Sequence, residues 1–137
     1  MRVAIVFIAI KNRNYLFKIS QELAKGIETQ GHQVDVIDGV KQKDTQLSIY
    51  KYIAIGTEKI SFLGKISTRV ANFLSNAGIR GGKRCFAFVP KTIFACQRTM
   101  LHLMQAMEKE GMLIKYSKVL TSPEQAKNVG KRLHIMT

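Results

Sequence analysis

Hydrophobic residues form short runs, or at 32–38 alternate with polar residues, and these patterns predict five strands. Residues 2–10, RVAIVFIAI, are continuously apolar and rich in Val and Ile. Such runs are typical of strands that are covered on both faces of a parallel sheet. Further strands are predicted at 32–38, 52–56, 84–89 and 113–120. The last segment is less apolar than the others, so we expect it at an edge of the sheet.

Between these runs, apolar residues recur at the spacing of an amphipathic helix. The pattern predicts helices at 16–27, 63–77, 93–110 and 122–133, and a short one after Asp44. Gly31, Gly78 and Gly111 follow three of these segments as stop signals. Ser122 has the residue type of an N-cap for the last helix.

Strands and helices alternate along the whole chain, and no linker, repeat or low-complexity tract divides it. This alternation predicts βαβ units with right-handed crossovers and helices on both faces of the sheet. We therefore expect a single three-layer α/β domain over residues 1–137.

Basic residues dominate the charge of the chain. Lysine and arginine outnumber acidic residues by 22 to 9, which gives a formal net charge of +13. A field of this sign attracts nucleic acid, an acidic protein, a phosphorylated ligand or an anionic membrane surface. No basic segment carries interleaved aromatic residues, so no motif supports nucleic acid in particular. A merely basic, solvated surface is the other interpretation.

Motifs for catalysis or metal binding are absent from the sequence. The three histidines are isolated, and Cys85 and Cys96 have no metal or redox spacing. Methionines at 100, 104 and 107 have the helical spacing typical of core packing. No apolar stretch reaches the about 20 residues of a membrane span. We expect a cytoplasmic protein with reduced cysteines, and the sequence does not decide whether it is an enzyme.

Three stretches resemble the flavodoxin-like family. They are VAIVFI with the later KISQELAKGIETQGHQVDVID, then DTQLSIYKYIAIGTEK, and GKRCFAFV followed by a helix and EKEGMLI. The resemblance implies a doubly wound, five-stranded parallel sheet of order 2-1-3-4-5, with FMN at the switch point between the first and third strands. The loops at about 9–15, 56–64 and 90–95 would then contact the cofactor.

The first of these loops lacks the Thr-Gly-Asn-Thr stretch with which the family usually holds the phosphate. The aligned residues are Arg13, Asn14, Tyr15 and Leu16. Backbone N–H groups at a helix N-terminus bind phosphate without hydroxyl side chains. Asn12 and Asn14 tolerate the positive φ that glycine supplies, and Lys11 and Arg13 offer charge-assisted donors. The loop either retains an anion in this way or is an ordinary solvated loop.

The other two loops carry weaker signals. Gly56 either admits a ligand to the backbone or ends its strand, and we expect Glu58 and Lys59 to form a solvent-facing pair. Phe62 either stacks on a flavin or packs against the protein. The resemblance gives these cofactor contacts in the two loops: Gly56, Thr57, Lys59, Phe62, Pro90, Lys91, Thr92 and Phe94.

Two functions follow from these observations. The first is an FMN-binding, flavodoxin-like protein for electron transfer or small-molecule reduction, whose redox partner is expected to be acidic because this chain is basic. The alternative is a flavin-free, flavodoxin-like binding module that uses its basic surface for an acidic macromolecule or a phosphorylated ligand.

Overall fold

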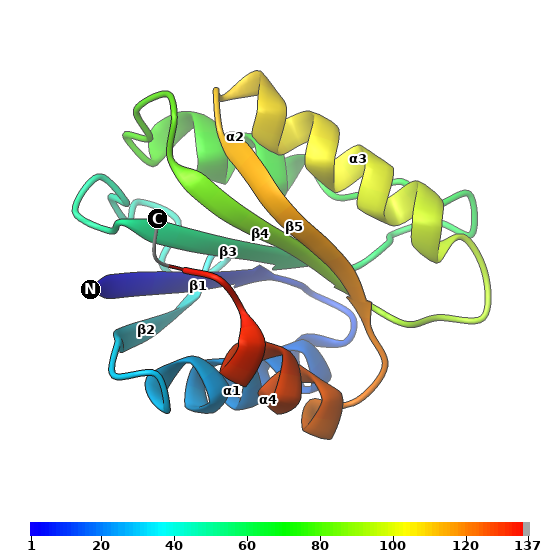
Figure 1. Cartoon of the computed structure of the whole chain (residues 1–137). Coiled ribbons are helices and arrows are strands. Elements are labelled where there is room, and N and C mark those ends of the chain that lie inside the picture. Colours follow the sequence, from blue (N-terminus) through cyan, green and yellow to red (C-terminus); the bar gives the residue numbers. More distant parts are fainter. Residues whose placement is uncertain (136–137) are drawn as a thin grey trace.

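Five parallel strands run through the centre of the molecule in the order β2-β1-β3-β4-β5 (Figure 1). The computed structural model describes residues 1–135. The strands are β1 Arg2–Ile8, β2 Gln33–Asp38, β3 Tyr52–Thr57, β4 Arg84–Pro90 and β5 Leu113–Leu120. This order confirms the predicted doubly wound sheet. The less apolar β5 lies at an edge, as predicted.

Four helices cover the two faces of the sheet, α1 and α4 on one side and α2 and α3 on the other (Figure 1). They are α1 Arg13–Glu28, α2 Thr68–Asn76, α3 Cys96–Lys109 and α4 Pro123–Arg132. The α4 start matches the prediction, because the Ser122 hydroxyl accepts a hydrogen bond from the Gln125 N–H at 3.1 Å. The three-layer arrangement is therefore the predicted one.

The predicted short helix after Asp44 is wrong. Residues 39–51 cross from β2 to β3 as turns. Leu47 is fully buried, and the Tyr50 hydroxyl donates to Asp35 at 2.7 Å. Two anchors fix this crossover to the domain, but they do not make the apolar stripe that a helix needs.

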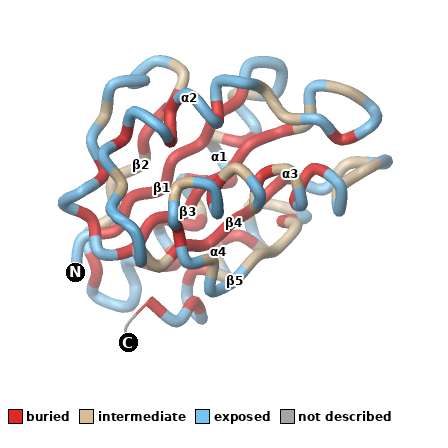
Figure 2. Tube along the Cα trace, turned by 90° about the horizontal axis from the view of Figure 1, so that it is seen from above, coloured by how far each residue is buried: buried red, intermediate tan, exposed pale blue. Residues whose placement is uncertain are grey.

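Two apolar layers form the core, one on each face of the sheet. Figure 2 shows the buried strands at the centre of the chain trace, with exposed segments around them. Met100 and Met107 are buried in the layer beneath α3, which confirms their predicted packing role. No helix within residues 1–135 has both the length and the apolar character needed to cross a bilayer.

The helices α2 and α3 begin later than predicted, so the loops before them are longer. The Ser67 hydroxyl caps α2 by accepting from the Arg69 N–H at 3.1 Å. Ala95 precedes α3 with a left-handed backbone, at φ 65°. Both starting points lie beyond apolar residues that the sequence pattern assigns to the helices, and those residues belong to loops instead.

Candidate functional site

The loops that follow β1, β3 and β4 emerge from the same end of the sheet, on the right in Figure 1. We call residues 9–15, 57–69 and 90–98 the loop end. Parallel strands bring their carboxyl ends together, and ligands of open α/β sheets bind in the crevice at this edge. The predicted site residues lie in the loop end, except Leu16 and Gly56, which directly adjoin it.

The carboxylate of Glu58 occupies the turn before α1. Its Oε2 accepts hydrogen bonds from the backbone N–H groups of Ile10 and Lys11, both at 2.8 Å. Its Oε1 accepts from the Asn12 N–H at 2.9 Å. Convergent N–H groups at a helix N-terminus form an anion-binding site. The anion at this site is the chain's own carboxylate, and Glu58 is only 5% exposed.

The expected solvent-facing pair of Glu58 and Lys59 is therefore wrong. The Lys59 ammonium donates to the Phe94 carbonyl at 2.7 Å and lies 5.9 Å from the centre of the Phe94 ring. The two side chains diverge because consecutive residues leaving a strand point to opposite sides. Glu58 was not among the predicted site residues, and the sequence carries no local signal that separates it from an exposed glutamate.

The turn also reaches its shape without the expected positive φ at Asn12 or Asn14. Asn12 has φ −112°, and Asn14 lies inside α1. Among the described residues, Ala95 is the non-glycine residue with positive φ. The three N–H groups nevertheless converge, so an asparagine in the left-handed region is not needed to form this site.

Arg13 points toward the end of β2 instead of the turn. Its Nε donates to Asp38 Oδ2 at 2.7 Å, and its guanidinium lies 5.7 Å from the Phe7 ring centre and 5.8 Å from that of Phe17. Burial raises the pKa of Asp38, but the bonds from Arg13 and from two backbone N–H groups outweigh it and hold this pKa below its ordinary value. Arg13 is thus already engaged by an anion of the protein.

The other predicted residues of the first loop fall into two groups. Lys11, Asn14 and Tyr15 are exposed and accessible to a ligand. Leu16 is fully buried in the core between α1 and the sheet. Its side chain has no free surface at the loop end, because the apolar stripe of α1 begins at this residue.

Gly56 and Thr57 are engaged inside the fold. A Cβ at Gly56 would lie 2.2 Å from an atom of the Phe88 ring, so the glycine makes room for this ring. The Thr57 hydroxyl donates to the Ile8 carbonyl at 2.7 Å and is fully buried. These contacts connect β3 to its neighbours, and they leave neither residue free for a cofactor.

The loop after β4 is stabilised by its own hydrogen bonds. The Thr92 hydroxyl donates to the Phe94 carbonyl at 2.8 Å, and the Thr92 N–H donates to Cys96 Sγ at 3.1 Å. Pro90 is buried at the end of β4, and Lys91 is exposed. Phe94 is 65% exposed. The loop therefore holds its large side chains out toward solvent.

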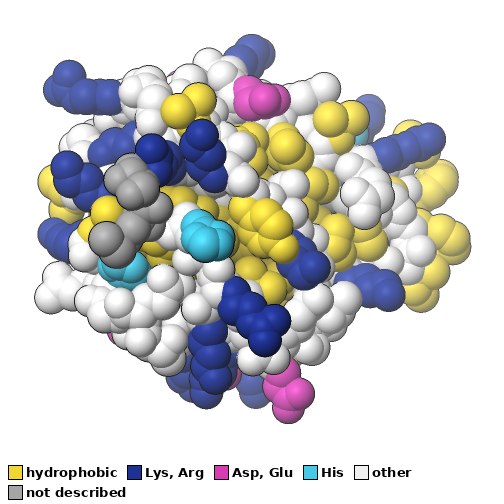
Figure 3. Space-filling model, viewed as in Figure 1, with side chains coloured by type: hydrophobic (Ala, Val, Ile, Leu, Met, Phe, Trp, Pro, Cys, Tyr) yellow, Lys and Arg dark blue, Asp and Glu magenta, His cyan; other side chains and the backbone are white. Residues whose placement is uncertain are grey.

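Apolar and basic side chains share the surface of the loop end. Figure 3 shows both kinds gathered on the right, over the loops after β3 and β4. The exposed large apolar residues are Ile10, Tyr15, Ile60, Phe62, Leu63, Ile93 and Phe94. The cations, apart from the paired Arg13, are Lys11, Lys59, Lys65, Arg69, Lys91 and Arg98. The acidic residue of these segments is the buried Glu58, so the exposed charge of the loop end is positive.

The residues present do not fit FMN in this arrangement. The three N–H groups that would bind its phosphate are bonded to Glu58. The cavity beside Glu58 measures about 150 Å³, below the roughly 300–1,000 Å³ usual for ligand pockets. Among residues 1–135, no group of three or more His, Cys, Asp or Glu side chains has the arrangement of a metal site.

Solved structures place this fold among the flavodoxin-like proteins. A flavodoxin from the domain Archaea aligns with a TM-score of 0.72 and 16% identity, over 97% of this chain and 96% of that one. Flavodoxin 1 from Bacillus cereus aligns with a TM-score of 0.70 and 16% identity, over 95% of each chain. An NAD(P)H:quinone oxidoreductase from Methanothermobacter marburgensis has a TM-score of 0.70 and 11% identity, over 98% and 99%.

Comparison by sequence adds no relative. No family model matches the chain, and no curated protein matches it. The protein therefore has the flavodoxin-like fold, established by its structure. Its function is therefore inferred from the residues at the loop end.

Proposed function

We propose that this protein is a flavodoxin-like binding module that works without FMN and binds an acidic protein through its loop end. The absence of FMN is inferred from the Glu58 carboxylate, which accepts hydrogen bonds from all three N–H groups of the turn before α1. A phosphate that enters this turn must displace a carboxylate that is covalently held beside it. The tethered group competes at a high effective concentration.

The surface of the loop end supports the second half of the proposal. Interfaces between proteins combine an apolar centre with a charged rim, and aromatic residues are enriched in the centre. Ile93 is 91% exposed and Phe62 is 76% exposed, and the exposed cations Lys91 and Lys65 lie on the same two loops. Aliphatic side chains find no matching surface on a nucleic acid backbone, so we infer a protein partner with apolar and acidic residues.

FMN-dependent electron transfer is the second candidate function. One observation favours it: the turn before α1 is shaped to hold an anion, at the switch point where flavodoxin-like proteins bind FMN. In that case the phosphate replaces the Glu58 carboxylate in the turn. The two candidates differ in whether wild-type protein binds FMN.

A flavin titration of the wild-type protein and of Glu58→Ala separates the candidates. We expect wild-type protein to leave the fluorescence of FMN unquenched at tens of micromolar. The Glu58→Ala variant vacates the turn and is expected to bind inorganic phosphate more tightly than wild type. Stoichiometric quenching of FMN by wild-type protein would overturn the flavin-free assignment.

A labelled peptide tests whether the loop end binds a partner with acidic and apolar residues. The probe alternates acidic pairs with Leu and Phe, and its control carries lysine at every acidic position. We expect the acidic peptide to bind, and Lys65→Gln/Lys91→Gln to weaken it about fivefold or more. Lys109→Gln/Lys131→Gln, which removes two exposed cations elsewhere, is the matched control. Equal binding of both peptides, or a preference for single-stranded DNA with a steep salt dependence, would reject an acidic protein partner.

A further inference from the structure

A second cavity lies away from the loop end, between the edge strand β5 and α4, and its volume is about 400 Å³. Residues from the start of β3, from β5, from α4 and from the segment after α4 line this cavity. Figure 3 shows an apolar area in the middle of the viewed face, bordered by Lys, Arg and His side chains. This volume suits a small organic molecule.

Close packing of two helices explains why the cavity is open. A Cβ at Gly26 would lie 2.1 Å from the Lys127 carbonyl oxygen, and a Cβ at Gly130 would lie 2.4 Å from that of Leu23. The two glycines thus let α4 approach α1 closely. Since α4 packs mainly against α1 and sparsely against β5, the neighbouring part of the sheet is left partly uncovered.

The aromatic ring of Tyr116 forms part of the cavity wall. Tyr116 on β5 lines it and stacks on Phe86, with ring centres 5.4 Å apart and planes inclined by 16°. Phe86 in turn stacks on Phe88 at 5.7 Å. Tyr116 is 43% exposed. Its ring is therefore held in place by the stack and presents an accessible aromatic surface.

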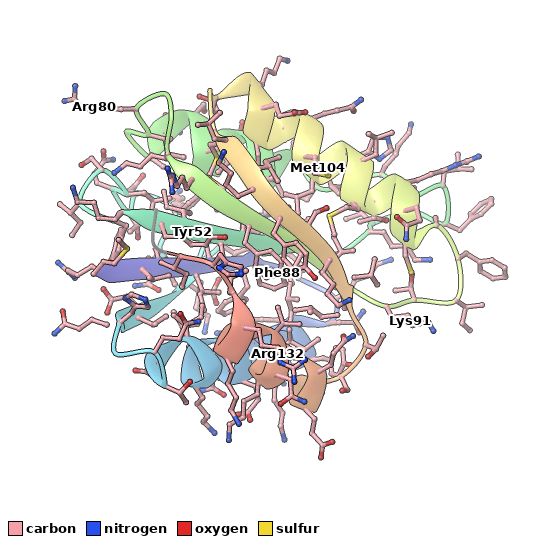
Figure 4. All side chains as sticks on the ribbon, in the orientation of Figure 1. Tyr52, Arg80, Phe88, Lys91, Met104 and Arg132 are labelled. Atoms are coloured by element: carbon pink, nitrogen blue, oxygen red, sulfur yellow. The ribbon has the colours of Figure 1, made fainter. Side chains whose placement is uncertain are left out.

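Tyr52 is a buried residue of the cavity lining. Its exposed fraction is 1%, and Figure 4 labels its side chain. Its hydroxyl oxygen has no hydrogen-bond partner within residues 1–135. Burial, and then the nearby Cys85, raise the pKa of Tyr52, so the hydroxyl stays protonated and able to donate. An unpartnered buried hydroxyl is costly unless another group bonds to it.

Positive charge surrounds the opening. Lys115, Lys118 and Arg132 line the cavity together with His134, and no acidic residue lies among the described residues that form it. Arg132 reaches this region from α4 (Figure 4). Arginine binds a carboxylate with two parallel hydrogen bonds. The opening therefore favours an anion, and the interior favours an apolar ring.

We propose that this cavity binds a small aromatic carboxylate that carries a hydrogen-bonding group at the end opposite its carboxylate. The ring packs on Tyr116, Arg132 and Lys118 bind the carboxylate, and the Tyr52 hydroxyl pairs with the far polar group. This site is independent of the loop end and of the function proposed for it.

Three probes test this proposal: 6-hydroxy-2-naphthoate, 2-naphthoate and the uncharged 2-naphthamide. Binding is measured by probe fluorescence, and amide shifts in an NMR spectrum locate the site. We expect the hydroxylated acid to bind wild type about fivefold to tenfold more tightly than 2-naphthoate. Tyr52→Phe removes one oxygen atom, and we expect this variant to bind the two acids with equal affinity.

Charge variants test whether the cations at the cavity opening bind the carboxylate of the probe. Lys118→Gln/Arg132→Gln is expected to weaken both carboxylates about tenfold and to leave 2-naphthamide unchanged. Lys91→Gln at the loop end is the matched control and should change none of the three. The proposal is overturned if no naphthoate binds at millimolar concentration, if the hydroxyl ratio persists in Tyr52→Phe, or if the amide shifts fall at the loop end instead of 115–118 and 128–134.

Discussion

At the scale of single residues, the turn before α1 depends on one carboxylate. The first N–H groups of a helix and of the turn before it have no partners within the helix. Glu58 binds the N–H groups of Ile10, Lys11 and Asn12, and the last of these is the N-cap of α1. The Asn12 side chain makes no cap bond itself. Glu58 thus satisfies the N–H groups that directly precede the helix, and it joins the end of β3 to the start of α1.

We expect Glu58→Gln to destabilise the protein by about 2–3 kcal/mol, because hydrogen bonds to a charged group are the stronger ones. A glutamine also turns its NH₂ group toward one of the three donors. The free energy of unfolding in urea measures the loss. Glu108→Gln removes an exposed carboxylate from α3 and is expected to cost less than about 0.5 kcal/mol. Equal costs for the two variants would contradict a structural role for Glu58.

Asp38 makes stability depend on acid pH. Its pKa in the folded protein is lowered, since the bonds from Arg13, Lys41 and Val40 outweigh the effect of burial. A lowered pKa contributes stability above the unfolded value of about 4, and this contribution is lost as the pH falls through the folded value.

We therefore expect Asp38→Asn to be less stable than wild type at neutral pH, with a difference that shrinks as the pH falls from about 6 to about 3. Urea unfolding at a series of pH values gives this difference. Arg13→Gln, which removes the partner, is expected to show the same convergence. A difference that stays constant over this range would argue against the linkage.

At the scale of secondary-structure elements, the contact of α1 with α4 depends on two glycines. Their missing Cβ atoms allow backbone to meet backbone, as the short distances at Gly26 and Gly130 show. The Gln30 side chain extends the contact by donating to the carbonyls of Gly130 and Leu133, at 2.7 and 3.0 Å. This pairing sets the position of α4 and thereby opens the cavity beside β5.

Gly26→Ala is expected to destabilise the protein by about 1–3 kcal/mol, because the added methyl group pushes against backbone atoms that cannot turn away. Alanine favours a helix over glycine by up to about 1 kcal/mol, so a negligible steric effect would show as stabilisation. Thermal and urea unfolding measure the sign. Gly81→Ala is the control, since a Cβ there meets nothing within 4 Å.

At the scale of the whole molecule, the net charge of +13 is spread over a small domain. Several acidic groups are already paired internally, as in the ion pairs Arg2–Asp35, Arg13–Asp38 and Lys25–Glu22. The surplus cations therefore repel one another across the surface. Self-repulsion of this kind destabilises a compact state and is screened by salt.

We expect the melting temperature to rise by a few degrees when NaCl increases from about 0.02 to about 0.5 M. Exposed ion pairs lose stability over the same range, but each contributes at most about 1 kcal/mol. Calorimetry at several salt concentrations checks the direction. A melting temperature that falls with salt would mean that the ion pairs outweigh the repulsion.

Much of the architecture follows from local patterns in the sequence. The apolar run of β1, the helical stripe of α1 and the weaker apolar character of β5 each reflect how many faces of an element are buried. Such periodicity is carried by neighbouring residues, and the alternation of strands and helices allows few topologies. For this reason the three layers could be predicted, and the resemblance to the flavodoxin-like family supplied the sheet order. The absence of a helix after Asp44 depended on the anchors at Leu47 and Tyr50.

The site depended on contacts between residues far apart in the chain. Glu58 and Lys11 are separated by 47 positions, and no local pattern indicates that this carboxylate turns inward to the amides before α1. The pairing of Arg13 with Asp38 also joins residues that are far apart in the chain. No local pattern indicates this pairing, or that the Tyr52 hydroxyl is left without a partner among the described residues. By itself the sequence determined which segments form strands and helices and how they are layered, because burial imposes a period on each element. The tertiary structure alone decided which polar groups meet, because folding brings distant side chains together with directions that periodicity does not record.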